Sequence, residues 1–235
     1  MKSYLFLFLI QERIDIIMSL KEKVVIPNYT LGEELVNAIS HGIGALLGIA
    51  ALVLCVVFSA IHHNPTAVVA SSIYGASLII LYLISTLYHS LKVNNGKRVL
   101  CIIDHCNIFL LIAGSYTPYV LITLKGAVGW TLFGIIWGAA IIGIILNAID
   151  LKKYRKISVA AYIAMGWAVL FAIKPLTENL KPGGMVFLVL GGIAYTIGAI
   201  FYGLGKKKRY MHSVFHFFVL AGSILQFFSI FFYVI

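Results

Sequence analysis

Charged residues are scarce in this sequence. Only 11% of its 235 residues are charged, whereas 61% are hydrophobic. Soluble domains contain about a quarter charged and about half apolar residues. A soluble fold of this length cannot bury so much apolar surface, so the composition excludes a soluble protein and indicates one that is surrounded by lipid. The length allows one helical bundle and no soluble domain beside it.

Acidic residues are especially few. Eight Asp and Glu stand against 18 Lys and Arg, which gives a net charge of +10. In a soluble protein this excess would suggest nucleic-acid binding. Here the basic residues fall in short runs between apolar segments, so we interpret them as topology signals of a membrane protein and expect no nucleic-acid partner.

The sequence has few cysteines and lacks the pattern of a signal peptide. The three cysteines, Cys55, Cys101 and Cys106, all lie in apolar segments, and their odd number argues against a disulfide framework. We expect them to be buried packing residues. The apolar run within residues 1–10 is too short to span a bilayer, and no small-residue cleavage site follows it. We therefore expect an amphipathic extension, or a true start at Met18.

Seven apolar stretches are long enough to cross a membrane, and the fifth of them is the shortest. The sequence thus predicts an all-α integral membrane protein, a seven-transmembrane-helix bundle over residues 31–235 that follows an N-terminal cytosolic extension over residues 1–30. Pro118 is expected to kink the third helix. The stretches cover residues 37–61, 67–91, 100–124, 127–149, 157–174, 183–205 and 212–235.

The basic residues also predict the orientation of the bundle. All but three of the 18 Lys and Arg lie before the first span or between spans two and three, four and five, or six and seven. The other side carries only Lys125, Lys174 and Lys181. Basic loops stay in the cytosol, and short loops obey this rule best. We therefore expect a cytosolic N-terminus and an external C-terminus in the cell membrane.

Five polar side chains lie inside the expected spans, where ionisable groups are costly and usually functional. Each lies near the cytosolic boundary of its span, on the order of 5–10 Å inside it at about 1.5 Å per residue. Chance would scatter such groups over both leaflets, so their common depth indicates one site. They are Ser85 and His89 in the second span, Asp104 in the third, and His212 and His216 in the seventh.

The spacing of these residues suggests a metal site. His212 and His216 are four residues apart and share one helix face, so they can bind one ion together. With His89 they make three imidazoles, which with one open position form the ligand set of a catalytic zinc. Asp104 could hold the water on the metal without binding the ion itself.

Each of these residues also has an ordinary explanation. Histidines can be structural, a serine such as Ser85 often bonds its own helix or aids packing, and an aspartate such as Asp104 often complements the dipole at a helix start. His41, near the cytosolic start of the first span, is a candidate for a supporting partner of the ligands, for a fourth ligand, or for an interfacial residue packed on Gly42 and Gly44.

Taken together, the motif of Ser85-x-x-x-His89, Asp104 and His212-x-x-x-His216 resembles the hemolysin III family. That family is a bacterial branch of the progestin and adipoQ receptor family, whose wider superfamily includes alkaline ceramidases. The resemblance extends from about residue 31 to the end. It includes ELVNAISHGIG from Glu34, YLISTLYHS from Tyr82 and DHCNIFLLIAGSYTPY from Asp104.

The resemblance implies a seven-helix bundle in which His89, His212 and His216 hold zinc. Asp104 would contact the water on the metal, and Ser85 would lie beside the site. Receptor members of the wider family carry an additional soluble N-terminal region that this sequence lacks, so the resemblance does not imply a receptor role. Ceramidases of the superfamily make hydrolysis of an amide the nearest analogous reaction.

Three functions are compatible with these observations. The first is a zinc-dependent hydrolase that takes a lipid amide or ester from the cytosolic leaflet, with Asp104 and Ser85 as catalytic residues. The second is a pore-forming cytolysin, disfavoured as a monomer because the polar residues gather at one end of the spans, although oligomeric pores remain open. The third is a regulator of membrane lipid state with structural zinc. Membrane lipids are the expected partners, and a homo-oligomer is compatible with the sequence.

Overall fold

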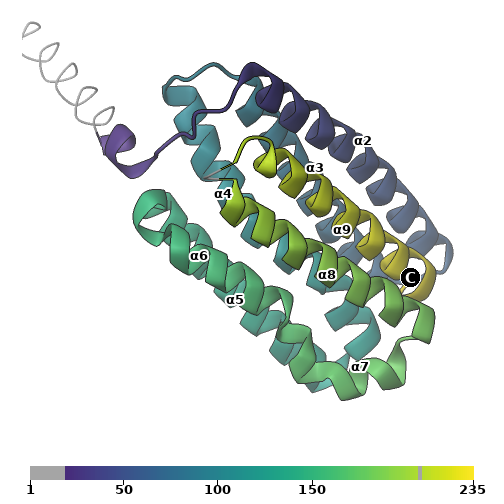
Figure 1. Ribbon diagram of the computed structural model, residues 1–235. Helices are drawn as coiled ribbons and strands as arrows, with labels where there is room; N and C mark the ends of the chain where they lie inside the picture. Colours follow the sequence, from purple (N-terminus) through teal and green to yellow (C-terminus); the bar gives the residue numbers. More distant parts are fainter. Residues whose placement is uncertain (1–18, 206–207) are drawn as a thin grey trace, which may run out of the picture.

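The computed structural model describes residues 19–205 and 208–235, and no strand occurs among them (Figure 1). The expectations for residues 1–18, including the start at Met18, lie outside the described residues. Seven helical segments are long and apolar enough to cross a membrane, which confirms the predicted class and number of spans. They comprise α2 (Leu31–Ile61), α3 (Pro65–Ser90), α4 (Asn95–Pro118) with a π-helix (Tyr119–Leu124), α5 (Gly126–Ile149), α6 (Leu151–Gly166) with a 3-10 helix (Ala168–Ala172) and α7 (Ile173–Asn179), α8 (Pro182–Leu204) and α9 (Met211–Tyr233).

Polar caps explain where several helices begin. Thr30 forms a capping box with Glu33 at the start of α2. Asn64 and Asn94 accept hydrogen bonds from backbone N–H groups in the first turns of α3 and α4. Each cap satisfies a donor that has no partner within its own helix, which matters where the helix enters lipid.

The third span departs from a regular helix where the sequence predicted a distortion. Pro118 ends α4, and the chain continues as a π-helix to Leu124. Proline lacks the N–H group that would continue the α-helical pattern, which accounts for the change at this point. The following residue, Lys125, has a positive φ of 50° and starts the turn into α5.

Two sequence expectations about loops were wrong. The basic run after Asp150 was expected to be a loop, but α6 begins at Leu151, so the fifth span is longer than predicted. Asp150 caps this helix by accepting a hydrogen bond from Lys153 N at 2.9 Å, and the basic side chains extend from the helix toward water. Lys97 was also expected in a loop, yet it lies in the first turn of α4 and is 1% exposed.

Glycines allow the helices to approach one another closely. A Cβ atom at Gly44 of α2 would overlap the ring of Tyr82 of α3, and one at Gly143 of α5 would overlap the ring of Phe109 of α4. Small residues commonly permit such packing in membranes, where no hydrophobic force drives helices together. The helices pack in the order α2, α3, α4, α5, α6, α8 and α9, and α9 returns to α2.

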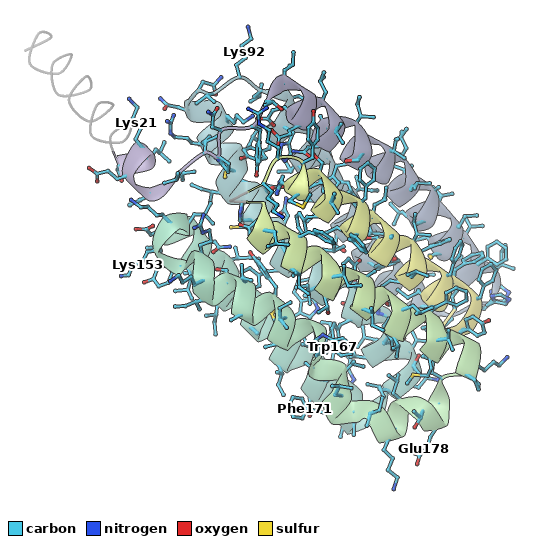
Figure 2. All side chains as sticks on the ribbon, viewed as in Figure 1. Lys21, Lys92, Lys153, Trp167, Phe171 and Glu178 are labelled. Carbon is cyan, nitrogen blue, oxygen red and sulfur yellow. The ribbon has the colours of Figure 1, made fainter. Side chains whose placement is uncertain are left out.

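The two ends of the bundle differ in charge. Figure 2 shows Lys21, Lys92 and Lys153 at one end, which we call the basic end, and Glu178 at the other. The loop before α9 carries Lys208 and Arg209 to the basic end as well. This matches the predicted grouping of basic residues, while the side of the membrane on which this end lies remains a prediction. Cys55, Cys101 and Cys106 are buried and free, as expected.

Candidate metal centre

Three histidines from two helices converge near the basic end of the bundle. His89 lies in the last turn of α3, and His212 and His216 lie in the first two turns of α9. Their ligand nitrogens all lie within 4.8 Å of one another, and the Nε2 atoms of His212 and His216 are 3.1 Å apart. The structure thus brings His89 together with a pair of histidines that lies more than 120 positions further along the chain. Among the described residues, no other group of His, Cys, Asp or Glu has this arrangement.

The start of α9 determines how His212 and His216 are presented. Tyr210 adopts a left-handed conformation with φ of 59°, and its N–H donates to Glu33 Oε1 at 2.7 Å. This contact ties the start of α9 to the first turn of α2. The helix then begins at Met211, and the four-residue spacing places both imidazoles on the face that is turned to the interior.

The three histidines are suited to hold a metal ion. His89 and His216 are each 2% exposed, and His212 is 9% exposed. Among the described residues, His89 Nε2 and His216 Nδ1 are buried without a hydrogen-bond partner. Buried polar atoms normally have a partner, and imidazole nitrogens are common ligands of zinc, copper, iron and nickel. The three histidines could therefore hold a metal ion, and the binding of an ion by these residues remains a prediction.

His41 lies beside this group but is not a member of it. It belongs to the third turn of α2, and its ring stacks on the ring of His216. The rings of His41 and Tyr82 also meet, nearly perpendicular to each other. A ring stacked on a ligand ring presents its face, whereas a metal is bound through a ring nitrogen in the plane. The supporting position that the sequence suggested for His41 thus fits the geometry better than the fourth-ligand position.

Asp104 and Ser85 line a cavity of about 200 Å³ that also reaches His41 and His216. Asp104 is not part of the group of three histidines, and its contact with a metal-bound water stays a prediction. Both residues thus face a space beside the histidines, as their predicted roles require.

The cavity continues from the histidines through the interior of the bundle. Its lining includes Leu176 of α7 and Gln226 of α9, and almost all other lining side chains beyond the histidines are apolar or aromatic. Gln226 lies ten residues after His216, which is roughly 15 Å along the helix. An apolar space of this length beside a polar site can accept a hydrocarbon chain.

The sequence did not predict a role for two charged residues that lie near the histidines. Glu34 Oε2 lies 2.6 Å from His89 Nδ1, and Glu34 Oε1 lies 2.5 Å from Lys97 Nζ. Lys97 was counted only as a loop charge. Glu34 lies just before the predicted first span of residues 37–61, so the sequence did not mark it as an ionisable group within a span.

Tyr29 was also missed. It precedes α2, and its ring stacks on His212 with centroids 5.0 Å apart and an angle of 17° between the planes. Its centroid lies 5.8 Å from that of His89. Burial raises the pKa of Tyr29 well above its ordinary value, so the phenol stays neutral. The segment before the first span therefore covers the histidines at the basic end.

Comparison with known proteins identifies the family. The family described as "Haemolysin-III related" matches residues 29–227, which include every residue of the site. The chain belongs to the hemolysin III family. This confirms the resemblance based on the serine, histidine and aspartate motif, and with the seven apolar helices it makes the chain a multi-pass protein of the cell membrane.

Relatives extend over nearly the whole chain. "Hemolysin-3" of Bacillus cereus is 47% identical over 214 residues, which are 91% of this chain and 97% of that protein. "Hemolysin-3 homolog" of Bacillus subtilis (strain 168) is 44% identical over 87% of this chain and 96% of its own length. "Monocyte to macrophage differentiation factor" of Homo sapiens is 24% identical over 86% of this chain and 84% of its own length. Hemolysin III proteins thus have distant relatives outside bacteria.

Proposed function

We propose that the chain is a zinc-dependent hydrolase that cleaves a lipid amide or ester taken from the cytosolic leaflet. The observation that carries the proposal is that the group of three histidines adjoins an apolar cavity. His216, whose ring nitrogens converge with those of His89 and His212, lines a long apolar cavity, and two further polar residues, Asp104 and Ser85, line the same cavity. A site of this kind accepts a lipid whose polar bond lies at the histidines and whose chain fills the interior.

The residues divide the chemistry among them. The histidines bind zinc, which when bound supplies a Lewis acid that polarises a carbonyl and favours ionisation of water. Asp104 accepts a proton from the water that attacks the carbonyl carbon, and Ser85 donates a hydrogen bond to the carbonyl oxygen as it gains negative charge. Asp104 then gives the proton to the leaving amine or alcohol as its bond to the carbonyl carbon breaks.

The first test is the metal itself. The protein is purified in mild detergent without added metal, and bound elements are measured by mass spectrometry. We expect near one zinc per chain, and loss of that zinc when His89, His212 and His216 are all changed to alanine. The absence of zinc from the unchanged protein would contradict the proposal.

The second test separates binding from chemistry. The Asp104→Asn variant keeps the shape of the side chain but loses a basic carboxylate. It should retain zinc while hydrolysis of lipid amides and esters falls by about 10²- to 10⁴-fold, the usual contribution of an acid–base group. Equal hydrolysis by the two proteins would remove Asp104 from the mechanism.

A pore-forming function is the second candidate, and it is favoured by the name of the 47% identical relative, "Hemolysin-3". Release of a dye from sealed vesicles by the purified protein tests it. Leakage that is unchanged in the triple-alanine variant would support a cytolysin and would separate the histidines from that activity. Leakage by neither protein, together with zinc-dependent hydrolysis, would leave the hydrolase as the function.

A further inference from the structure

Glu34 links His89 to a buried lysine through the two oxygens of one carboxylate. Oε2 is 2.6 Å from His89 Nδ1, and Oε1 is 2.5 Å from Lys97 Nζ. The three residues come from α2, α3 and α4, and the side chains of His89 and Lys97 are 0% and 1% exposed. A contact between three helices through buried charged groups is costly unless each group is paired, so this arrangement needs a reason.

The contact with Glu34 decides which nitrogen of His89 is free. An ionised carboxylate can only accept hydrogen bonds, so the contact with Glu34 requires Nδ1 to carry the hydrogen and donate it. The Asn37 side-chain nitrogen also lies near Nδ1, at 3.4 Å, but the shorter contact with Glu34 is the stronger one. In the neutral ring, Nε2 then holds the lone pair. Among the described residues Nε2 is buried and without a hydrogen-bond partner, so it is the atom left to join His212 and His216.

Lys97 places a positive charge against Glu34, and a neighbouring positive charge favours the ionised form of a carboxyl group. Its ammonium group also donates to the carbonyl oxygen of Leu91 at 2.8 Å and lies 5.1 Å from the centroid of the Tyr88 ring. These contacts satisfy a lysine that is almost wholly buried, and the positive charge offsets the carboxylate. The first turn of α4 therefore supplies the counter-charge for the partner of a histidine on α3.

We propose that Glu34, held by Lys97, is a positioning residue that orients His89 and fixes its tautomer for metal binding. The inference rests on the proposed metal site and adds to it a residue that does not touch the ion. Carboxylates that accept the second N–H of a ligand histidine raise its basicity and restrict rotation of its ring. Removal of such a partner typically weakens metal affinity by about 10- to 100-fold.

Zinc affinity tests this proposal without any assay of activity. Each purified protein competes with a chromophoric chelator for zinc. We expect Glu34→Ala to weaken binding by about 10- to 100-fold. Glu34→Gln, which still offers an oxygen acceptor but no charge, should lie between Glu34→Ala and the unchanged protein. Lys97→Met should also weaken binding, because it leaves the carboxylate without its counter-charge.

Glu22→Gln is the matched control. Glu22 is an exposed carboxylate next to Lys21 at the basic end, and it lies outside the helices that carry the histidines. Its variant loses the same charge and should bind zinc within about twofold of the unchanged protein, because a carboxylate that touches no ligand does not tune one. A loss equal to that of Glu34→Gln would overturn the proposal, since the effect would then follow negative charge at the basic end rather than the contact with His89.

A spectroscopic measurement separates positioning from a general loss of structure. Cobalt(II) replaces zinc, and its visible absorption reports the geometry of the ligands. Glu34→Gln should bind cobalt with a shifted spectrum while thermal unfolding in detergent stays close to that of the unchanged protein. An unshifted spectrum and unchanged zinc affinity in the Glu34 variants would overturn the positioning role while the metal site stands. Failure of the unchanged protein to bind either metal would overturn the proposed function and this inference together.

Discussion

The imidazole ring of His41 stacks on that of His216, with centroids 3.6 Å apart and planes 16° from parallel. Both ring nitrogens of His41 are buried and have no hydrogen-bond partner in the described part of the chain. The stack places a fourth histidine against the site without adding a fourth ligand nitrogen to the group. This geometry favours the prediction of an open site, which catalysis requires, over one closed by four protein ligands, which is typical of structural zinc.

The His41→Ala variant should keep its metal. Because His41 meets His216 through the faces of the two rings, its removal leaves all three convergent nitrogens in place. We expect zinc per chain to equal that of the unchanged protein, measured by elemental mass spectrometry, whereas His216→Ala should lose most of it. Loss of zinc from both variants alike would show four ligands and would favour the structural role of the ion.

Tyr29 should slow the exchange of metal with the cytosol, because its ring lies over His212. An aromatic contact of this kind contributes about 0.5–1.5 kcal/mol, so Tyr29→Ala should speed removal of zinc by a chelator by roughly tenfold or less. The rate is followed by stopped-flow absorbance. Tyr29→Phe keeps the ring and should release zinc at the rate of the unchanged protein. Equal rates for the unchanged protein and both variants would mean that the ring does not cover the path by which zinc leaves.

Close packing of α4 on α5 predicts a contrast between two glycines of the same helix. A Cβ at Gly143 would overlap the Phe109 ring, whereas one at Gly138 would meet nothing within 4 Å. Gly143→Ala should destabilise the bundle by about 1–3 kcal/mol, the usual cost of overpacking, and Gly138→Ala should be neutral or slightly stabilising. Thermal unfolding in detergent measures both. Equal midpoints of thermal unfolding for the two variants would contradict the close packing of α4 on α5.

The predicted orientation can be tested on intact cells with a membrane-impermeant maleimide. Lys153 at the basic end and Glu178 at the opposite end are both exposed, and the three native cysteines are buried and should react little. We expect Glu178→Cys to be labelled and Lys153→Cys to be labelled only after the cells are opened, since basic segments remain in the cytosol. The reverse pattern would invert the bundle and place the histidines at the outer leaflet.

Much of the fold was predictable because hydropathy is a local property. Each span is an apolar run long enough to require lipid, so all seven could be counted without knowing how they pack. The residues at which the helices begin and end were less predictable. The segment after Asp150 looked like a loop, because four basic residues follow it, but a capped helix can carry such residues when their long side chains reach water.

The candidate site was predictable for a different reason. Ser85, His89, Asp104, His212 and His216 are conspicuous because polar groups are expensive within a span, and their positions near the same end could be read from the loop charges. The sequence by itself therefore determined the class of protein, the number of spans and the residues that meet at one depth.

Only the tertiary structure decided which atoms of these helices touch. The rotation of each helix about its axis and its choice of neighbours depend on packing of glycines and large side chains across the whole bundle, which no local pattern contains. This is why the contact of Glu34 with His89, the burial of Lys97 and the stacking of Tyr29 on His212 were not foreseen. Each joins residues that are distant in the chain, and side-chain directions on two separate helices must agree before such a contact can form.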